Sequence, residues 1–157
     1  MRKRGLTGDE LRAFLSRPLI CRIATLDGDG SPYVVPCWFS YEDGAFFVFA
    51  VEGSRWGDNL RRDPRVAITV DEYLALDRPA TSVVVQGRAR VLGGPGWTGD
   101  SETDARMRHA YVRFAVRYGA DEEETGSALA QLSHMDHAWI RIDPQRLISS
   151  REVDDVT

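Results

Sequence analysis

Residues 18 to 51 contain successive strand-forming runs that are joined by short turns. The runs PLICRIATL, YVVPCWFSY and AFFVFAV are rich in β-branched and aromatic residues, and DGDGSP and EDG separate them. Turns this short join antiparallel neighbours, whereas parallel strands need a long crossover. The region therefore predicts an antiparallel meander and disfavours a parallel doubly wound sheet.

The rest of the chain adds further strands and a few helices. Strands are expected over 65–72, 80–92 and 137–150, the last one broken near Pro144. Helices are expected from a capping box at Thr7 and Glu10 to Pro18, over 54–62, over the amphipathic segment 102–119, and for a turn or two within 121–132. We therefore predict a mainly β fold in one domain over residues 1–157, with its core at about 8–150. Its architecture is a six-stranded antiparallel barrel with helical plugs.

The second strand-forming run is apolar on both of its faces. Val35 alternates with Val34, Pro36 and Trp38, so neither face resembles a solvated surface. Pro36 cannot donate to a ladder, which places the run at an edge or a bulge. The second face is expected to meet a helix, a ligand or another subunit. Trp38 has a broad apolar surface that could lie against a flat ring or at a subunit contact. Alternatively, it is simply part of the core.

Composition narrows the class of protein. The formal net charge is -4, which argues against a nucleic-acid partner. No apolar run approaches the roughly 18 to 20 residues that span a bilayer, so we expect a cytoplasmic protein without a membrane partner. Cys21 and Cys37 lie in apolar runs and are expected to be buried thiols. No metal site is expected, because His109, His134 and His137 lack ligand partners at suitable spacing.

The segment GSRWGDNLRRDPRVAITV, residues 53–70, predicts a binding site for a phosphate group. Ser54 precedes the expected helix, so its hydroxyl can cap the first turn, where unpaired N–H groups and the helix dipole favour an anion. Arg55 adds a fork of donors that matches phosphate oxygens, and Asn59 lies four residues on, along the same face. The alternative is a capped surface helix whose arginines are only solvated.

A polar line follows on a later strand. Gln86, Arg88 and Arg90 occupy alternate positions and therefore share one face. This face either closes a ligand site or is the solvated side of the sheet. No P-loop, nucleophile elbow or glycine-rich dinucleotide motif occurs, which argues against hydrolase and nucleoside triphosphate chemistry.

The order of these segments resembles the pyridoxamine 5'-phosphate oxidase-like split-barrel superfamily, and more narrowly its flavin- or deazaflavin-dependent oxidoreductase branch. The most specific parts of the resemblance are V-x-P-x-W-F and G-S-R-x-x-x-N-L-R-x-D-P-R-V, within roughly residues 8 to 150.

The resemblance implies a six-stranded FMN-binding split barrel that forms a homodimer, with cofactors in grooves between the subunits. It places the cofactor phosphates against Ser54, Arg55 and Asn59. It places the ring near Val35, Pro36 and Trp38, with Gln86 approaching from a later strand. Many relatives carry basic residues where this chain has Trp56 and Gly57-Asp58. This departure leaves the choice between FMN and coenzyme F420 open.

Three functions follow as hypotheses. The first is hydride transfer from reduced F420 or FMN to a small unsaturated molecule, with no catalytic acid or base identifiable from the sequence. The second is a non-catalytic carrier, sensor or store of flavin, F420 or haem. The third is a small dimeric interaction module with an empty groove.

Overall fold

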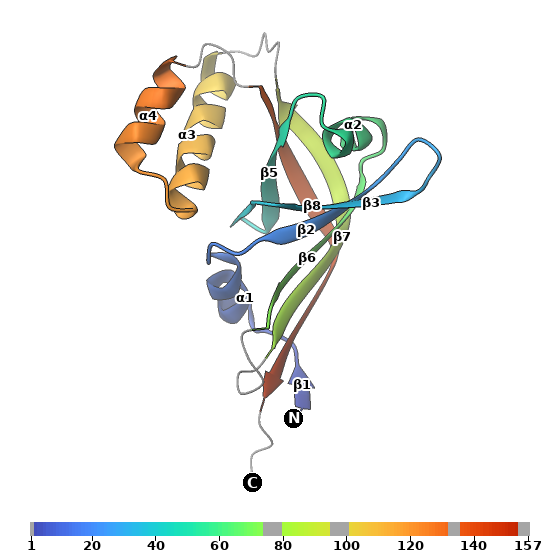
Figure 1. Ribbon diagram of the computed structural model, residues 1–157. Coiled ribbons are helices and arrows are strands. Elements are labelled where there is room, and N and C mark those ends of the chain that lie inside the picture. The colour runs from blue at the N-terminus through green and yellow to red at the C-terminus, as the bar shows by residue number, and fades with distance from the viewer. Residues whose placement is uncertain (1, 74–79, 95–100, 132–135, 154–157) are drawn as a thin grey trace.

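The computed structural model describes residues 2–73, 80–94, 101–131 and 136–153 of the chain. These residues form an eight-stranded sheet in which every strand pair is antiparallel, and four helices flank it (Figure 1). The strand order is β3 (Pro32–Cys37), β2 (Cys21–Leu26), β6 (Arg65–Glu72), β7 (Thr81–Gly93), β8 (His137–Val153), β5 (Ala45–Val51) and β4 (Ser40–Glu42), and β1 (Arg2–Arg4) pairs with β8. The sheet curls without closing, so the mainly β split-barrel prediction is confirmed.

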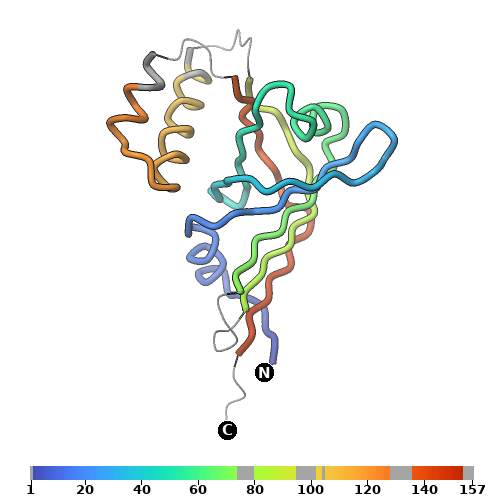
Figure 2. The backbone as a smooth tube through the Cα atoms, viewed as in Figure 1, coloured from blue at the N-terminus to red at the C-terminus, as the bar shows by residue number. Residues whose placement is uncertain are grey.

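The elements follow one another in this order: β1 (Arg2–Arg4), α1 (Gly8–Leu15), β2 (Cys21–Leu26), β3 (Pro32–Cys37), β4 (Ser40–Glu42), β5 (Ala45–Val51), α2 (Arg55–Arg62), β6 (Arg65–Glu72), β7 (Thr81–Gly93), α3 (Ser101–Arg117), α4 (Glu122–Gln131) and β8 (His137–Val153). The expected helices are therefore all present. The path of the chain in Figure 2 shows the β2–β3 hairpin extending past α2, while α3 and α4 lie at the opposite side of β5.

The sheet has more strands than the sequence predicts. The meander predicted over residues 18–51 is wrong, because the run 33–41 does not form one strand and its two parts, β3 and β4, lie at opposite ends of the strand order. The run divides at Trp38 and Phe39. There the Tyr118 hydroxyl lies 3.0 Å from the amide nitrogen of Phe39 and 2.7 Å from the carbonyl oxygen of Leu19. These bonds to a side chain replace ladder bonds, so the strand ends. The other additional strand, β1, is a short basic segment without apolar alternation. Nothing in its own sequence predicts that it pairs with β8.

The prediction that the last strand breaks near Pro144 is wrong. β8 runs without interruption from His137 to Val153. Instead, the register of β7 against β8 shifts between Gln86 and Gly87, where Gly87 stands opposite Pro144. A bulge of this kind accommodates a residue that has no N–H to donate. The irregularity is real, but it bends the strand rather than ending it.

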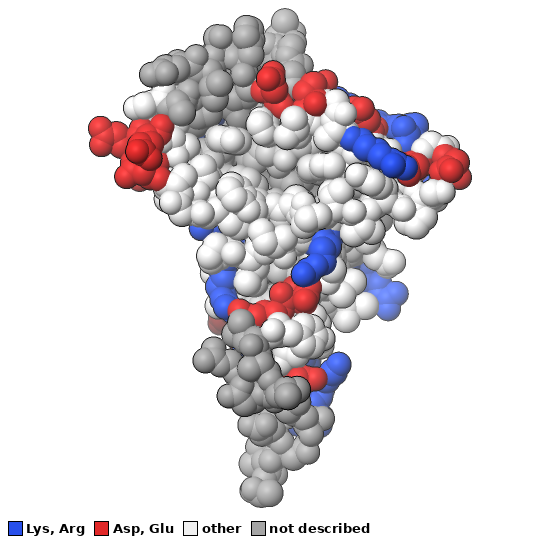
Figure 3. Space-filling model, viewed as in Figure 1, with Lys and Arg blue, Asp and Glu red and all other residues white. Residues whose placement is uncertain are grey.

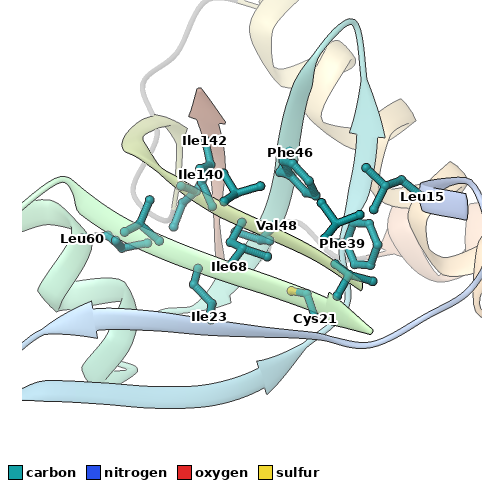
Figure 4. Close-up of a cluster of buried hydrophobic side chains, with 14 of the residues drawn as sticks. Leu15, Cys21, Ile23, Phe39, Phe46, Val48, Leu60, Ile68, Ile140 and Ile142 are labelled. Atoms are coloured by element: carbon teal, nitrogen blue, oxygen red, sulfur yellow. The ribbon is translucent and has the colours of Figure 1, made fainter. Parts of the chain in front are cut away.

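The core lies inside the curled sheet. Buried side chains from β2, β5, β6 and β8 meet there, with Leu15 of α1 and Leu60 of α2 at its two ends (Figure 4). Leu15 is positioned by the capping box of α1: Thr7 accepts from the Glu10 amide, and the Glu10 carboxylate accepts from the Thr7 amide, as predicted. Among the described residues, no helix is long and apolar enough to cross a membrane.

Candidate functional site

The start of helix α2 lies against the edge strand β3. The guanidinium of Arg55 stands over the ring of Tyr33, with 4.4 Å between Cζ and the ring centroid. Figure 1 shows the same arrangement, with α2 beside the β2–β3 hairpin. The phosphate segment and the edge strand, which the sequence singles out separately, are therefore adjacent.

Ser54 occupies the N-cap position of α2, but its hydroxyl does not cap the helix. No hydrogen bond joins the side chain to the first turn, so the predicted role of this hydroxyl is wrong. The Oγ atom is buried and has no hydrogen-bond partner among the residues that the structure describes. It points towards Gly57, where an added Cβ would lie 2.9 Å from Oγ and 3.1 Å from the Cβ of Ala50. Close packing of the helix against β5 therefore turns the hydroxyl inward, and this packing requires glycine at position 57.

Arg55 is held by a carboxylate that sequence reasoning missed. Its Nε and Nη2 donate to Asp27, at 2.9 and 2.5 Å. The bonds from Arg55 and then from Asn59 lower the pKa of Asp27, and Asp27 in turn raises the pKa of Arg55. The side chain of Arg55 is 62% exposed, with Nη1 outside this fork. An anion at this place must bind beside the Asp27 carboxylate or displace it from Arg55.

Asn59 is buried and uses its amide within the protein. Its Nδ2 donates to the hydroxyl of Thr25 at 3.1 Å and to Asp27 at 2.9 Å. Its Oδ1 accepts from Arg62 at 2.6 Å. In this arrangement Asn59 orients Asp27 and so the Arg55 fork. Direct contact between Asn59 and a cofactor stays a prediction.

The edge strand has the position that its proline predicts. Among the described residues, β3 ends the sheet order and pairs only with β2, where Pro36 stands opposite Arg22. Val34 is 58% exposed on the same face as Pro36, whereas the side chain of Val35 packs against the core. The run that is apolar on both faces in sequence is therefore a strand, β3, with one face packed on the core and the other exposed at the surface.

Trp38 lies just past the end of β3 and contacts Phe114 of α3 and Tyr118, which directly follows this helix. Its ring stacks on Tyr118 with centroids 4.4 Å apart and planes 2° apart, and it remains 45% exposed. A small apolar pocket of about 210 Å³ adjoins it, lined by Trp38, Phe49, Tyr111, Phe114, Ala115 and His137. Burial lowers the pKa of His137. Trp38 is thus neither pure core nor fully exposed, and its face borders a space for a flat group.

Gln86 is exposed on the outer face of the sheet, as are Arg88 and Arg90. The strands β2 and β6 separate it from β3. The predicted alternation along β7 is confirmed, because Val85 and Gly87 are buried between these polar positions. The fold of one chain therefore does not bring Gln86 to the edge strand.

The cysteines and histidines add no metal site among the described residues. Cys21 and Cys37 face each other across β2 and β3 with their Sγ atoms 3.3 Å apart, and both thiols are free. The contact with Cys21, together with burial, raises the pKa of Cys37. His134 lies outside the described residues.

Comparison with known proteins identifies the family. The model of the pyridoxamine 5'-phosphate oxidase family matches residues 7–149. The chain belongs to this family. No curated protein matches it.

Solved structures of this fold carry different names. A FAD-binding protein from Mesorhizobium loti is 25% identical, with a TM-score of 0.67 over 98% of this chain and all of that one (100%). An F420 reductase is 18% identical, with a TM-score of 0.61 over 87% of this chain and 94% of that chain. The haem storage protein HutZ from Vibrio cholerae is 22% identical, with a TM-score of 0.66 over 90% and 94% of the two chains. The last two, at these identities, show the shared fold alone.

The residues at the start of α2 fit the anionic part of a cofactor of the family. Arg55 keeps donors outside the Asp27 fork, and the first-turn N–H groups point out of the helix end, whereas the Ser54 hydroxyl faces inward and would have to turn to reach an anion. Asp27 and Tyr33 are the site residues that sequence reasoning missed. The segment DGDGSP predicts only a turn. Nothing in its sequence indicates that Asp27 forms an ion pair with an arginine 28 positions later.

Proposed function

We propose that the protein binds a flavin or the deazaflavin coenzyme F420 at the start of α2 and transfers a hydride from it to a small unsaturated molecule. When bound, such a cofactor supplies the hydride chemistry itself. The residues of this chain hold its anionic part, orient its ring and exclude water. Arg55 and the first turn of α2 would hold the phosphate, and the exposed edge of β3 with Trp38 would border the ring.

One observation carries this proposal: the anion-binding end of α2 adjoins an edge strand with unpaired backbone. Among the described residues, only β2 pairs with β3, so the backbone along the other side of β3 has no strand partner. A heteroaromatic ring with donors and acceptors along one edge suits such a strand. The aromatic pocket beside Trp38, of about 210 Å³, adds a small apolar space next to the proposed ring position.

We also propose that the protein acts as a homodimer and that the cofactor lies in a groove between the subunits. Exposed apolar side chains on the outer face of the sheet support this arrangement: Val34 is 58%, Val84 43% and Ile148 50% exposed. Figure 3 shows few charges in the middle of the surface over β2 and β3. A partner on this face would also offer a way for Gln86 of one chain to approach the ring bound by the other.

A non-catalytic binding protein is the second candidate. The bonds from Arg55 and Asn59 lower the pKa of Asp27, so this carboxylate serves as an ion-pair partner of Arg55, a holding role that a carrier needs as much as an enzyme does. The names of similar structures include both a reductase and a haem storage protein. The fold therefore suits either function.

Titration with F420, FMN, FAD and haemin tests the site. We expect saturable quenching or an absorbance shift with F420 or FMN. Arg55→Ala is expected to weaken binding by about 1 to 3 kcal/mol, the range for a charge-assisted hydrogen bond. Arg12→Ala removes the same charge from α1, far along the chain, and is the matched control. Equal affinity of both variants would remove Arg55 from the site.

Turnover needs a separate test. The purified protein is mixed anaerobically with the chemically reduced form of whichever cofactor binds, together with a panel of enones and quinones. We expect reoxidation of the cofactor that depends on protein and on one substrate class. Binding without any reoxidation across the panel would support the carrier and overturn the enzyme.

A further inference from the structure

A second cavity lies between α3 and the neighbouring strands, away from the start of α2. Its volume is about 650 Å³, which is within the range of sites for small organic ligands. Its lining contains none of the residues predicted to hold the cofactor. The lining residues with charged or aromatic side chains are Glu42, Asp43, Phe47, Arg90, Arg106, His109, Arg113, Trp139 and Arg141. In Figure 1, α3 and α2 lie at opposite sides of β5.

Two walls of the cavity are cationic. On the strand side, Arg90 of β7 and Arg141 of β8 are register partners. On the helix side, Arg106 and Arg113 lie two turns apart on α3, with His109 between them on the same face. Four guanidinium groups thus face one space with two lining carboxylates, in a chain whose formal net charge is -4. The local positive charge is a property of this cavity and not of the whole protein.

Acidic neighbours leave part of this charge unmatched. Arg113 pairs with Glu42 at 3.3 Å. Arg141 and Arg90 share one carboxylate, Asp143, at 2.7 and 4.0 Å. Within the described part of the chain, Arg106 forms no ion pair. Arginine is well suited to planar carboxylates, because its fork can donate two parallel hydrogen bonds.

The cavity also has an aromatic wall. The rings of Phe47 and Trp139 stack with centroids 5.9 Å apart and planes 29° apart. The Arg141 guanidinium stands 5.7 Å from the centre of the Phe47 ring. Trp139 is 7% exposed, and no residue in the described part of the chain accepts a hydrogen bond from its buried indole N–H. A ligand that fits these surfaces combines negative groups with a flat apolar body.

We propose that this cavity is a binding site for a small aromatic polycarboxylate. Carboxylates on the ligand would be held by the arginines of the two opposing walls, while its ring system lies against Phe47 and Trp139. Opposing cationic walls favour two negative groups over one. The proposal stands independently of the cofactor site, since the two sites share no residue.

Calorimetric titration with naphthalene-2,6-dicarboxylate tests the proposal, with 2-naphthoate and inorganic phosphate as comparison ligands. We expect saturable binding of the dicarboxylate at one site per chain, with 2-naphthoate and phosphate each binding at least about tenfold more weakly. Loss of one charge-assisted contact corresponds to a factor of about ten or more. Phosphate binding as tightly as the dicarboxylate would overturn the proposal, because the cavity would then hold only a generic anion.

Arginine variants locate the binding. Arg106→Gln is expected to weaken dicarboxylate binding about tenfold, and it breaks no ion pair within the described residues. Arg90→Gln provides a second variant from the opposite wall. Arg12→Gln makes the same charge change on α1, outside the cavity, and should keep the wild-type affinity. Absence of saturable binding, or the same affinity in the Arg106→Gln and Arg12→Gln proteins, would overturn the site, whatever the result of the cofactor titration.

Discussion

At the scale of single residues, Ser54 and Thr7 occupy equivalent positions and behave differently. Both precede a helix, but only the Thr7 hydroxyl accepts a hydrogen bond from its first turn. The Ser54 hydroxyl is buried without a partner, so its removal loses no hydrogen bond in the free protein. We therefore expect Ser54→Ala to leave the free energy of unfolding within about 0.5 kcal/mol of wild type, measured by urea denaturation.

Thr7→Ala is the matched control for this prediction. Losing its cap and half of the capping box should cost about 0.5 to 2 kcal/mol. In the presence of the cofactor, Ser54→Ala should lose affinity if the hydroxyl turns to the phosphate. A large loss of stability without cofactor would show that Ser54 caps α2 after all.

Glu10 makes the free energy of unfolding depend on pH in the acidic range. Its carboxylate accepts from Arg4 and from the Thr7 amide, and these bonds lower its pKa from 4.5 to about 2. A carboxyl whose pKa is lower in the folded state stabilises that state above its unfolded pKa. The stabilisation is present above about pH 4.5 and is lost as the pH falls towards 2.

Glu10→Gln isolates this contribution. We expect the variant to be less stable than wild type at pH 7 and the difference to shrink steadily between pH 4.5 and pH 2. Urea midpoints of both proteins, measured across this range, check the expectation. A difference that stays constant with pH would show that the Glu10 carboxylate contributes by packing rather than by charge.

At the scale of elements, local patterns predicted most of what lies within one hairpin or one helix. The capping box at Thr7, the α2 segment and the alternation of Gln86 with Val85 are all set by neighbours in sequence, and the structure has them. The failed Ser54 cap involves only its near neighbours Ala50 and Gly57, but the other differences depend on distant contacts. The division between β3 and β4 is made by Tyr118, and the Asp27–Arg55 pair joins a turn to a helix start. No period in the sequence encodes such pairings.

The close pairing of β7 with β8 requires glycine at position 87. An added Cβ at Gly87 would lie 2.5 Å from the carbonyl oxygen of Asp143, a backbone atom that cannot move aside cheaply. We therefore expect Gly87→Ala to destabilise the protein by about 1 to 3 kcal/mol or more. Gly126→Ala in α4 meets open space and should be neutral or stabilising by up to about 1 kcal/mol. Equal urea midpoints for the two variants would show that the ladder yields at this bulge.

At the scale of the whole molecule, the question is whether one chain forms the complete cofactor site, and the outer face of the sheet bears on it. The register aligns Pro36, Arg22, Thr69, Val84 and Ile148 in one row across five strands. Pro36, Val84 and Ile148 in this row are apolar, whereas Arg22 and Thr69 are polar, and Val84 and Ile148 remain 43% and 50% exposed. Neighbouring exposed apolar side chains of this kind suit a contact with another protein surface, and a second copy offers the same row in return.

Val84→Asp tests this arrangement, because it places a charge at the centre of the proposed contact. We expect the wild-type protein to be a dimer by light scattering at micromolar concentration, and Val84→Asp to be a monomer with reduced affinity for the cofactor. Val116→Asp introduces the same charge at a 37% exposed position on α3 and should stay dimeric. If Val84→Asp became monomeric and still bound the cofactor as wild type does, the site would be contained in one chain. Gln86, which is separated from β3 by β2 and β6, would then have no part in it.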